Sequence, residues 1–76
     1  MGEKMRIKYD EKNDAIYIRF SEEAYFESDE IKEGFIIDFD KKGKVVGLEI
    51  LDVSENLPQN SLEKISFETA KAKAVA

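Results

Sequence analysis

The sequence predicts one small α+β domain over residues 1–76, mainly antiparallel β, with a meander of about five strands built on two similar hairpins and a short C-terminal helix. Two segments of alternating apolar and polar residues predict the hairpins, because period-two alternation is typical of strands with one buried face. After Val53, a polar segment that contains Pro58 separates these strands from the predicted helix. The domain core is expected over residues 5–69, with 70–76 as a frayed tail.

The first hairpin is expected between residues 5 and 20. Pairing Asp10 with Ala15 sets Tyr9 opposite Ile16 and leaves residues 11–14 as the loop. This register places Arg6 opposite Arg19 on the polar face and collects the apolar residues on the other, because side chains alternate along a strand. The apolar set is Met5, Ile7, Tyr9, Ile16, Ile18 and Phe20.

The segment 21–34 is strongly acidic, and its only large apolar residues are Tyr25, Phe26 and Ile31. Their spacing does not fit a regular strand. We therefore expect an irregular or bulged edge strand of undetermined register, whose charge discourages pairing with another sheet edge.

The second hairpin is predicted from the same alternation of apolar residues, with Asp40 paired to Val45 and residues 41–44 as its loop. Gly43 then corresponds to Asn13 of the first loop, and both residue types tolerate positive φ. Residues 38–49 also match the spacing of a calcium loop. However, Lys42 stands where such a loop has a carboxylate, and the flanking residues are predicted to be strands, so we favour a β-turn. The apolar set here is Phe35, Ile37, Phe39, Val46, Leu48 and Ile50.

The C-terminal helix is expected to begin at Asn60 or Ser61, where Glu63 would complete a capping box. Leu62 and Ile65 would then face the sheet, and a helix covering one face of the sheet would leave the other face uncovered. The segment 65–69 fits either a continued helix or a returning strand.

Composition excludes several classes of function. The chain has no cysteine and no histidine, so thiolate ligands, disulfides and the usual general base are absent, and we predict no catalytic residue, metal site or cofactor. The net charge of −5 argues against nucleic acid as a partner. No apolar run is long enough to span a membrane and Met1 to Arg6 lack a signal-peptide pattern, so a cytoplasmic protein is expected. Abundant Lys and Glu are typical of a thermophilic source.

The candidate interaction or ligand-binding residues lie on the face opposite the main apolar set. The polar ones could form a site for a ligand or a partner's charged groups, or serve only as cross-strand ion pairs, with Asp38 or Glu49 offsetting the opposed arginines. The apolar ones, with Val53, would leave apolar surface on this side, which a second copy of the chain could cover in a homodimer. The candidates are Tyr17, Arg19, Ile36, Asp38, Glu49 and Leu51.

Four segments carry a resemblance to a known family: KYD at residues 8–10, DAIYIRF at 14–20, EGFIIDFD at 33–40 and GKVVGLEIL at 43–51. Together they resemble domain-of-unknown-function family 2283, a group of short bacterial and archaeal proteins. The resemblance implies no activity, because the family has none assigned, and it supplies no catalytic residues. Some members are encoded beside small suspected toxins, which would imply an antitoxin-like protein that binds a small basic partner.

Overall fold

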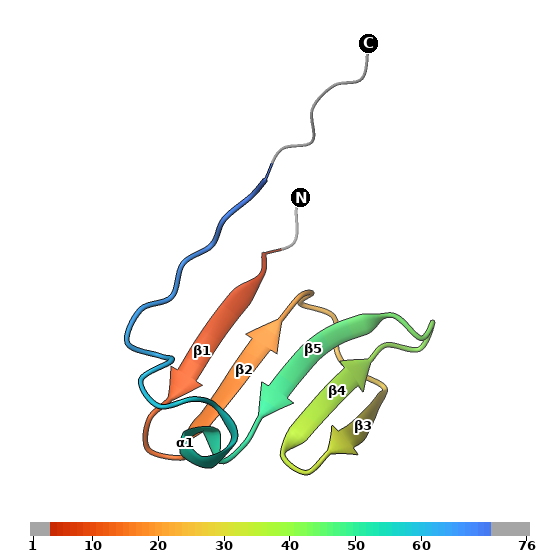
Figure 1. The fold of residues 1–76 in the computed structure, drawn as a ribbon. Helices are drawn as coiled ribbons and strands as arrows, with labels where there is room; N and C mark the ends of the chain where they lie inside the picture. The colour runs from red at the N-terminus through yellow and green to blue at the C-terminus, as the bar shows by residue number, and fades with distance from the viewer. Residues whose placement is uncertain (1–3, 71–76) are drawn as a thin grey trace.

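A computed structural model describes residues 4–70 and shows one antiparallel sheet with a short helix (Figure 1). The strands are β1 (Arg6–Asp10), β2 (Ala15–Arg19), β3 (Glu27–Lys32), β4 (Phe35–Phe39) and β5 (Val45–Ile50), and the helix is α1 (Val53–Asn56). The prediction of a mainly antiparallel β fold with five strands and one short helix after them is confirmed. No helix among residues 4–70 is long and apolar enough to cross a membrane.

The predicted meander is wrong, because the strand order is β1-β2-β5-β4-β3. Strands β3, β4 and β5 do follow one another across the sheet, but β5 returns to pair with β2, and the chain after β2 crosses to the far edge. The composition of β3 explains the order: all six of its residues are exposed, and an interior strand would have to bury its charges. Its edge position and its irregularity, between Glu30 and Lys32, agree with the prediction.

The hairpin registers agree with the prediction over most of their length. In the first, Tyr9 lies opposite Ile16, and in the second, Ile37 lies opposite Leu48. The register of the second hairpin shifts at Phe39, which pairs with Val45 and not with the predicted Val46. Alternation alone does not reveal such a bulge.

The turn between β4 and β5 causes this shift. The N–H of Asp40 donates to the carbonyl of Lys44 (2.9 Å), so the loop contains residues 41–43 and not the predicted 41–44. Gly43 has a φ of +85°, as expected, and such a residue typically closes a three-residue loop with a bulge. The first loop differs, because its positive φ of 53° is at Asp14 and not at Asn13, so the predicted correspondence of the two turns is wrong.

The helix lies earlier in the chain than predicted. Residues 53–56 form α1, whereas Asn60 has a φ of +65° and the segment 65–69 is neither helix nor strand. Leu62 is half-buried, but Ile65 is exposed and does not cover the sheet. Val53, expected on the face opposite the main apolar set, is buried and lines a hollow with Tyr9, a member of that set. Of the expected frayed tail, Ala70 is exposed and residues 71–76 lie outside the described part.

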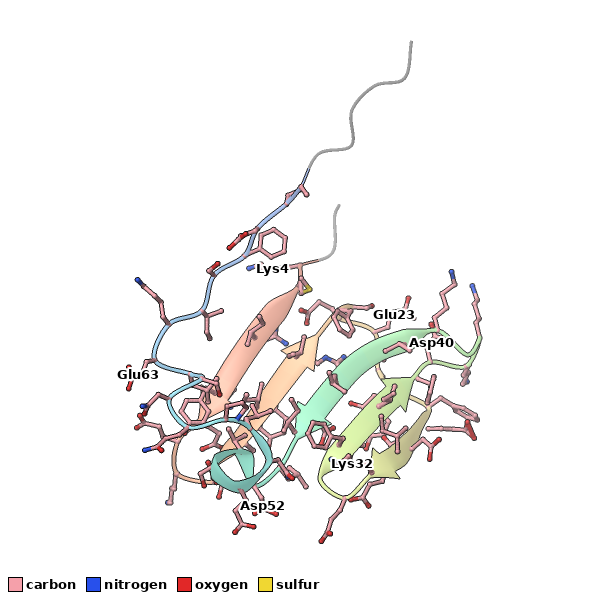
Figure 2. All side chains as sticks on the ribbon, in the orientation of Figure 1. Lys4, Glu23, Lys32, Asp40, Asp52 and Glu63 are labelled. Carbon is pink, nitrogen blue, oxygen red and sulfur yellow. The ribbon has the colours of Figure 1, made fainter. Side chains whose placement is uncertain are left out.

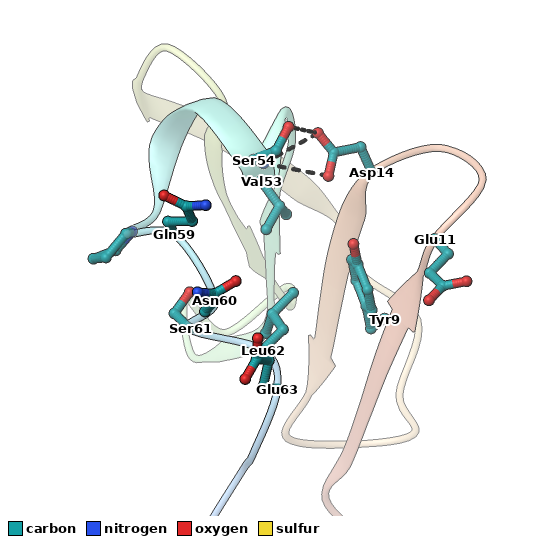
Figure 3. Close-up of a pocket in the computed structure, with 11 residues that line it drawn as sticks. Tyr9, Glu11, Asp14, Val53, Ser54, Gln59, Asn60, Ser61, Leu62 and Glu63 are labelled. Carbon is teal, nitrogen blue, oxygen red and sulfur yellow. Dashed lines mark hydrogen bonds between the residues drawn. The ribbon is translucent and has the colours of Figure 1, made fainter.

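A long-range contact holds α1 in this place. The carboxylate of Asp14 accepts hydrogen bonds from the N–H of Ser54 (3.1 and 3.2 Å) and from its Oγ (2.7 Å), as Figure 3 shows. The backbone carbonyl of Asp14 accepts a further bond from the N–H of Val53 (3.0 Å). These bonds satisfy backbone N–H groups at the start of the helix, which would otherwise lack partners.

We expect Asp14→Ala to lower the free energy of unfolding by about 1–2 kcal/mol, because it removes this cap and leaves a residue that disfavours positive φ. Asp14→Asn, which keeps an acceptor oxygen and tolerates positive φ, is expected to lose less. Urea unfolding of the two variants checks the difference. Equal losses would show that an acceptor oxygen and tolerance of positive φ at this position do not stabilise the fold.

The apolar residues of the two hairpins share one face of the sheet, but little covers them (Figure 2). Ile16 and Val46 are buried, at 5% and 3% exposure, together with Ala15 and Val53. Within residues 4–70, no large side chain is fully enclosed. We call the uncovered part of this surface the open face. It consists of Ile7, Ile18, Phe20, Ile37, Phe39 and Leu48, each half-buried or exposed.

Candidate functional site

The predicted polar residues do share one face of the sheet, the one opposite the open face. Tyr17 lies opposite Glu49, and Gly47 lies between Arg19 on β2 and Asp38 on β4. We call Tyr17, Arg19, Asp38 and Glu49 the polar cluster. The two apolar candidates, Ile36 and Leu51, are half-buried, and Ile36 pairs directly with Glu49.

Asp38 is the most unusual member of the polar cluster, because it is a carboxylate at 3% exposure. Ser28 Oγ of β3 donates a hydrogen bond of 2.6 Å to its Oδ1. A buried carboxylate needs such donors, since burial removes the water that would otherwise solvate it. The sequence did not identify Ser28, because the register of the acidic segment was undetermined.

Gly47 makes room for this arrangement. A Cβ atom at this position would lie 3.0 Å from Asp38 Oδ2, 3.3 Å from the Ile18 carbonyl oxygen and 3.5 Å from Arg19 Nη1. The absence of a side chain therefore lets the Asp38 carboxylate and the Arg19 guanidinium approach the same stretch of β5 backbone from opposite sides.

The positive charges of Arg6 and Arg19 are not offset by Asp38 or Glu49, as predicted, but by other groups. Arg6 pairs with Glu22, at 2.9 Å between Nε and Oε2, and both side chains are more than half exposed, so the pair contributes little to stability. Arg19 Nη2 donates to the carbonyl oxygen of Glu23 (2.6 Å). Within residues 4–70 neither arginine forms an ion pair with a carboxylate of the polar cluster.

The pKa of Glu49 is raised above its ordinary value. Partial burial is the largest cause, and a hydrogen bond with Asp38 and the negative charge of that carboxyl add to it, whereas Arg19 opposes the shift. Two neighbouring negative charges repel each other, so the presence of Asp38 favours the protonated form of Glu49.

This shift predicts how stability depends on pH. Because the folded-state pKa of Glu49 exceeds the unfolded one, its contribution is fully present below the unfolded pKa and is lost as pH rises through the folded pKa. We expect the melting temperature of the wild type, relative to Glu49→Gln, to fall as the pH rises through the range above 4.5, the ordinary pKa of this carboxyl group. A difference that stays constant over this range would show that Glu49 titrates normally.

Two hollows of the structure lie away from the polar cluster. One of about 450 Å³ is bounded by Tyr9, Asp14, Val53 and residues 58–63, where Figure 3 shows Tyr9 and Leu62 on opposite sides. A second, of about 360 Å³, is bounded by residues 23–26 and 40–42, where Lys41 Nζ lies 6.0 Å from the centre of the Phe26 ring. No residue of the polar cluster lines either hollow. Within residues 4–70, no cluster of three or more Asp or Glu side chains is arranged to hold a metal ion.

Comparison with known proteins gives one match. The model of the family described as "Protein of unknown function (DUF2283)" matches residues 6–54, which contain all five strands and the start of α1. No curated protein and no solved structure matches the chain. Because the family model covers more than half of the sequence, the chain belongs to family DUF2283.

Proposed function

We propose that this protein is a non-enzymatic interaction module that acts as a homodimer, joined through the open face. The observation that carries the proposal is the incomplete burial of apolar side chains at the centre of the sheet. Ile18 on β2 and Leu48 on β5 belong to interior strands and pair with each other, yet neither is buried.

A sheet with one apolar face normally packs that face against a second layer, because burial of apolar surface drives folding. Here α1 has four residues and lies over one end of the sheet only (Figure 1). Residues 4–70 of a single chain therefore supply no second layer over most of this face. A domain of this size gains only about 3–5 kcal/mol from its own core, and oligomerisation is a common way to add to it.

A second copy of the chain suits the open face in shape and chemistry. In a dimer with twofold symmetry the same surface lies on both sides of the contact, so an apolar face meets an apolar face. Two such sheets would pack about 10 Å apart and interdigitate their side chains. The expectation from the sequence placed the contact on the opposite side, at Ile36 and Leu51, but that side carries the buried carboxylate of Asp38.

Sedimentation velocity at micromolar concentration tests the proposal. We expect one species with twice the monomer mass of 8.7 kDa. A species of monomer mass that persists as the concentration rises would contradict the proposal.

A second candidate is an antitoxin-like role with a small basic protein, and the edge strand β3 favours it. Glu27, Asp29 and Glu30 lie on this strand, and all are exposed. Such an edge offers unpaired backbone groups together with negative charge to a basic partner. Co-expression with the neighbouring reading frame is expected to give a stable complex and to relieve toxicity, and failure to co-purify would count against this role.

A further inference from the structure

The segment 64–70 carries two large apolar side chains that contact almost nothing. Phe67 is 81% exposed and Ile65 is 59% exposed. Within the described part of the chain, no backbone hydrogen bond joins these residues to the sheet, and the one side-chain bond, from Ser66 to Glu68, is local. Ile65, Phe67 and Thr69 alternate with Ser66 and Glu68, which is typical of an extended segment with one apolar side.

The chain just before this segment is well held. Leu62 is half-buried in the hollow beside Tyr9 and Val53, and the N–H of Glu63 donates to the carbonyl of Asn60 (3.2 Å). From this anchor the segment runs away from α1 as an extended trace (Figure 1). The molecule thus combines an uncovered apolar face with an uncovered apolar arm that begins at the edge of the same sheet.

We propose that Ile65 and Phe67 pack on the open face of a second copy of the chain, so that the two subunits exchange their C-terminal arms. This inference rests on the homodimer proposed above and specifies which segment helps to close it. Within one chain the arm leaves Phe67 in water. Burial of one phenylalanine removes about 150–250 Å² from water, a substantial part of the roughly 800 Å² that each partner of a standard interface contributes.

Disulfide trapping between two differently tagged chains tests the exchange, because the protein has no cysteine of its own. One chain carries Phe67→Cys and the other Ile18→Cys, on the open face. The matched control replaces Ile18→Cys with Tyr17→Cys, the adjacent residue on the opposite face. Ile65→Cys provides a second probe of the arm in case Phe67→Cys weakens the contact.

We expect a covalent mixed-tag dimer with Ile18→Cys, at least about tenfold more abundant than with Tyr17→Cys. A wild type that sediments as a dimer but gives no such preference with either arm probe would overturn the exchange and leave the dimer intact. A disulfide within a single Ile18→Cys/Phe67→Cys chain, without mixed dimers, would show that the arm covers its own sheet. A monomeric wild type would overturn both proposals together.

Discussion

Replacing Leu48 with lysine is expected to raise the dissociation constant of the homodimer at least about 100-fold, equivalent to about 2.7 kcal/mol. Leu48 lies between Ile18 and Ile37 at the centre of the open face. In a dimer closed by this face, the ammonium group would be buried among apolar side chains without a partner of opposite charge. Sedimentation equilibrium of the variant and the wild type measures the change.

The matched control is Ile36→Lys. Ile36 is also a half-buried aliphatic residue of the sheet, but it points to the other face, where it pairs with Glu30 and Glu49. A lysine there gains acidic neighbours, so we expect the dissociation constant to change less than about threefold. Dissociation by Ile36→Lys with an intact Leu48→Lys dimer would assign the interface to the opposite face. Far-UV circular dichroism confirms that both variants remain folded.

The Gly34→Ala variant is expected to lose about 2–4 kcal/mol of unfolding free energy, most of what a domain of this size has. Gly34 has a φ of +87°, which L side chains rarely adopt. A Cβ atom there would also lie 2.7 Å from Asn56 Nδ2 and 3.2 Å from the carbonyl oxygen of Leu51. Asn56 cannot simply move away, because its amide donates a 2.8 Å bond to that carbonyl and so ties α1 to the end of β5.

Gly43→Ala separates the cost of the positive φ from the cost of the steric contact with Asn56 and Leu51. Gly43 has nearly the same φ, +85°, but a Cβ atom at this turn would have no other atom within 4 Å. We expect this variant to lose only about 1 kcal/mol, from backbone conformation alone. Urea unfolding of the two variants gives the difference, and equal losses would show that the contact of Gly34 with the helix has no energetic importance.

The strand pairing could be predicted from the sequence because it follows from a strong and local signal. Alternating apolar residues such as Ile7 and Ile18, or Ile37 and Leu48, specify one register, since a shift of one residue would turn them all toward water. The same signal placed the polar cluster on a single face. It did not reveal the bulge at Phe39, which depends on how the turn at Gly43 closes.

The parts that sequence reasoning missed depend on contacts between distant residues. The position of α1 follows from Asp14, forty residues before Ser54, whereas Asn60 and Glu63 offered a local capping pattern that the fold does not use. The strand order follows from the need to keep β3 at an edge. The hydrogen bond from Ser28 to Asp38 depends on the register of β3 against β4, which the sequence of the acidic segment does not determine.

The open face is exposed because the helix does not form where the sequence predicts it. A helix at Leu62 and Ile65 would have covered the main apolar set, which would have left Ile36 and Leu51 as the surface for a partner. With α1 at residues 53–56, the larger uncovered surface is the main set itself. The paired aliphatic residues at its centre therefore indicate where a second layer belongs.

Isotope-filtered nuclear Overhauser spectroscopy on a mixture of labelled and unlabelled chains tests the dimer face most directly. The proposed homodimer predicts intermolecular contacts from the methyl groups of Ile37 and Leu48 to the partner's open face, and from those of Ile18 to that face or to the exchanged arm. Intermolecular contacts from the methyl groups of Ile36 and Leu51 in their place, or none from either face, would contradict it.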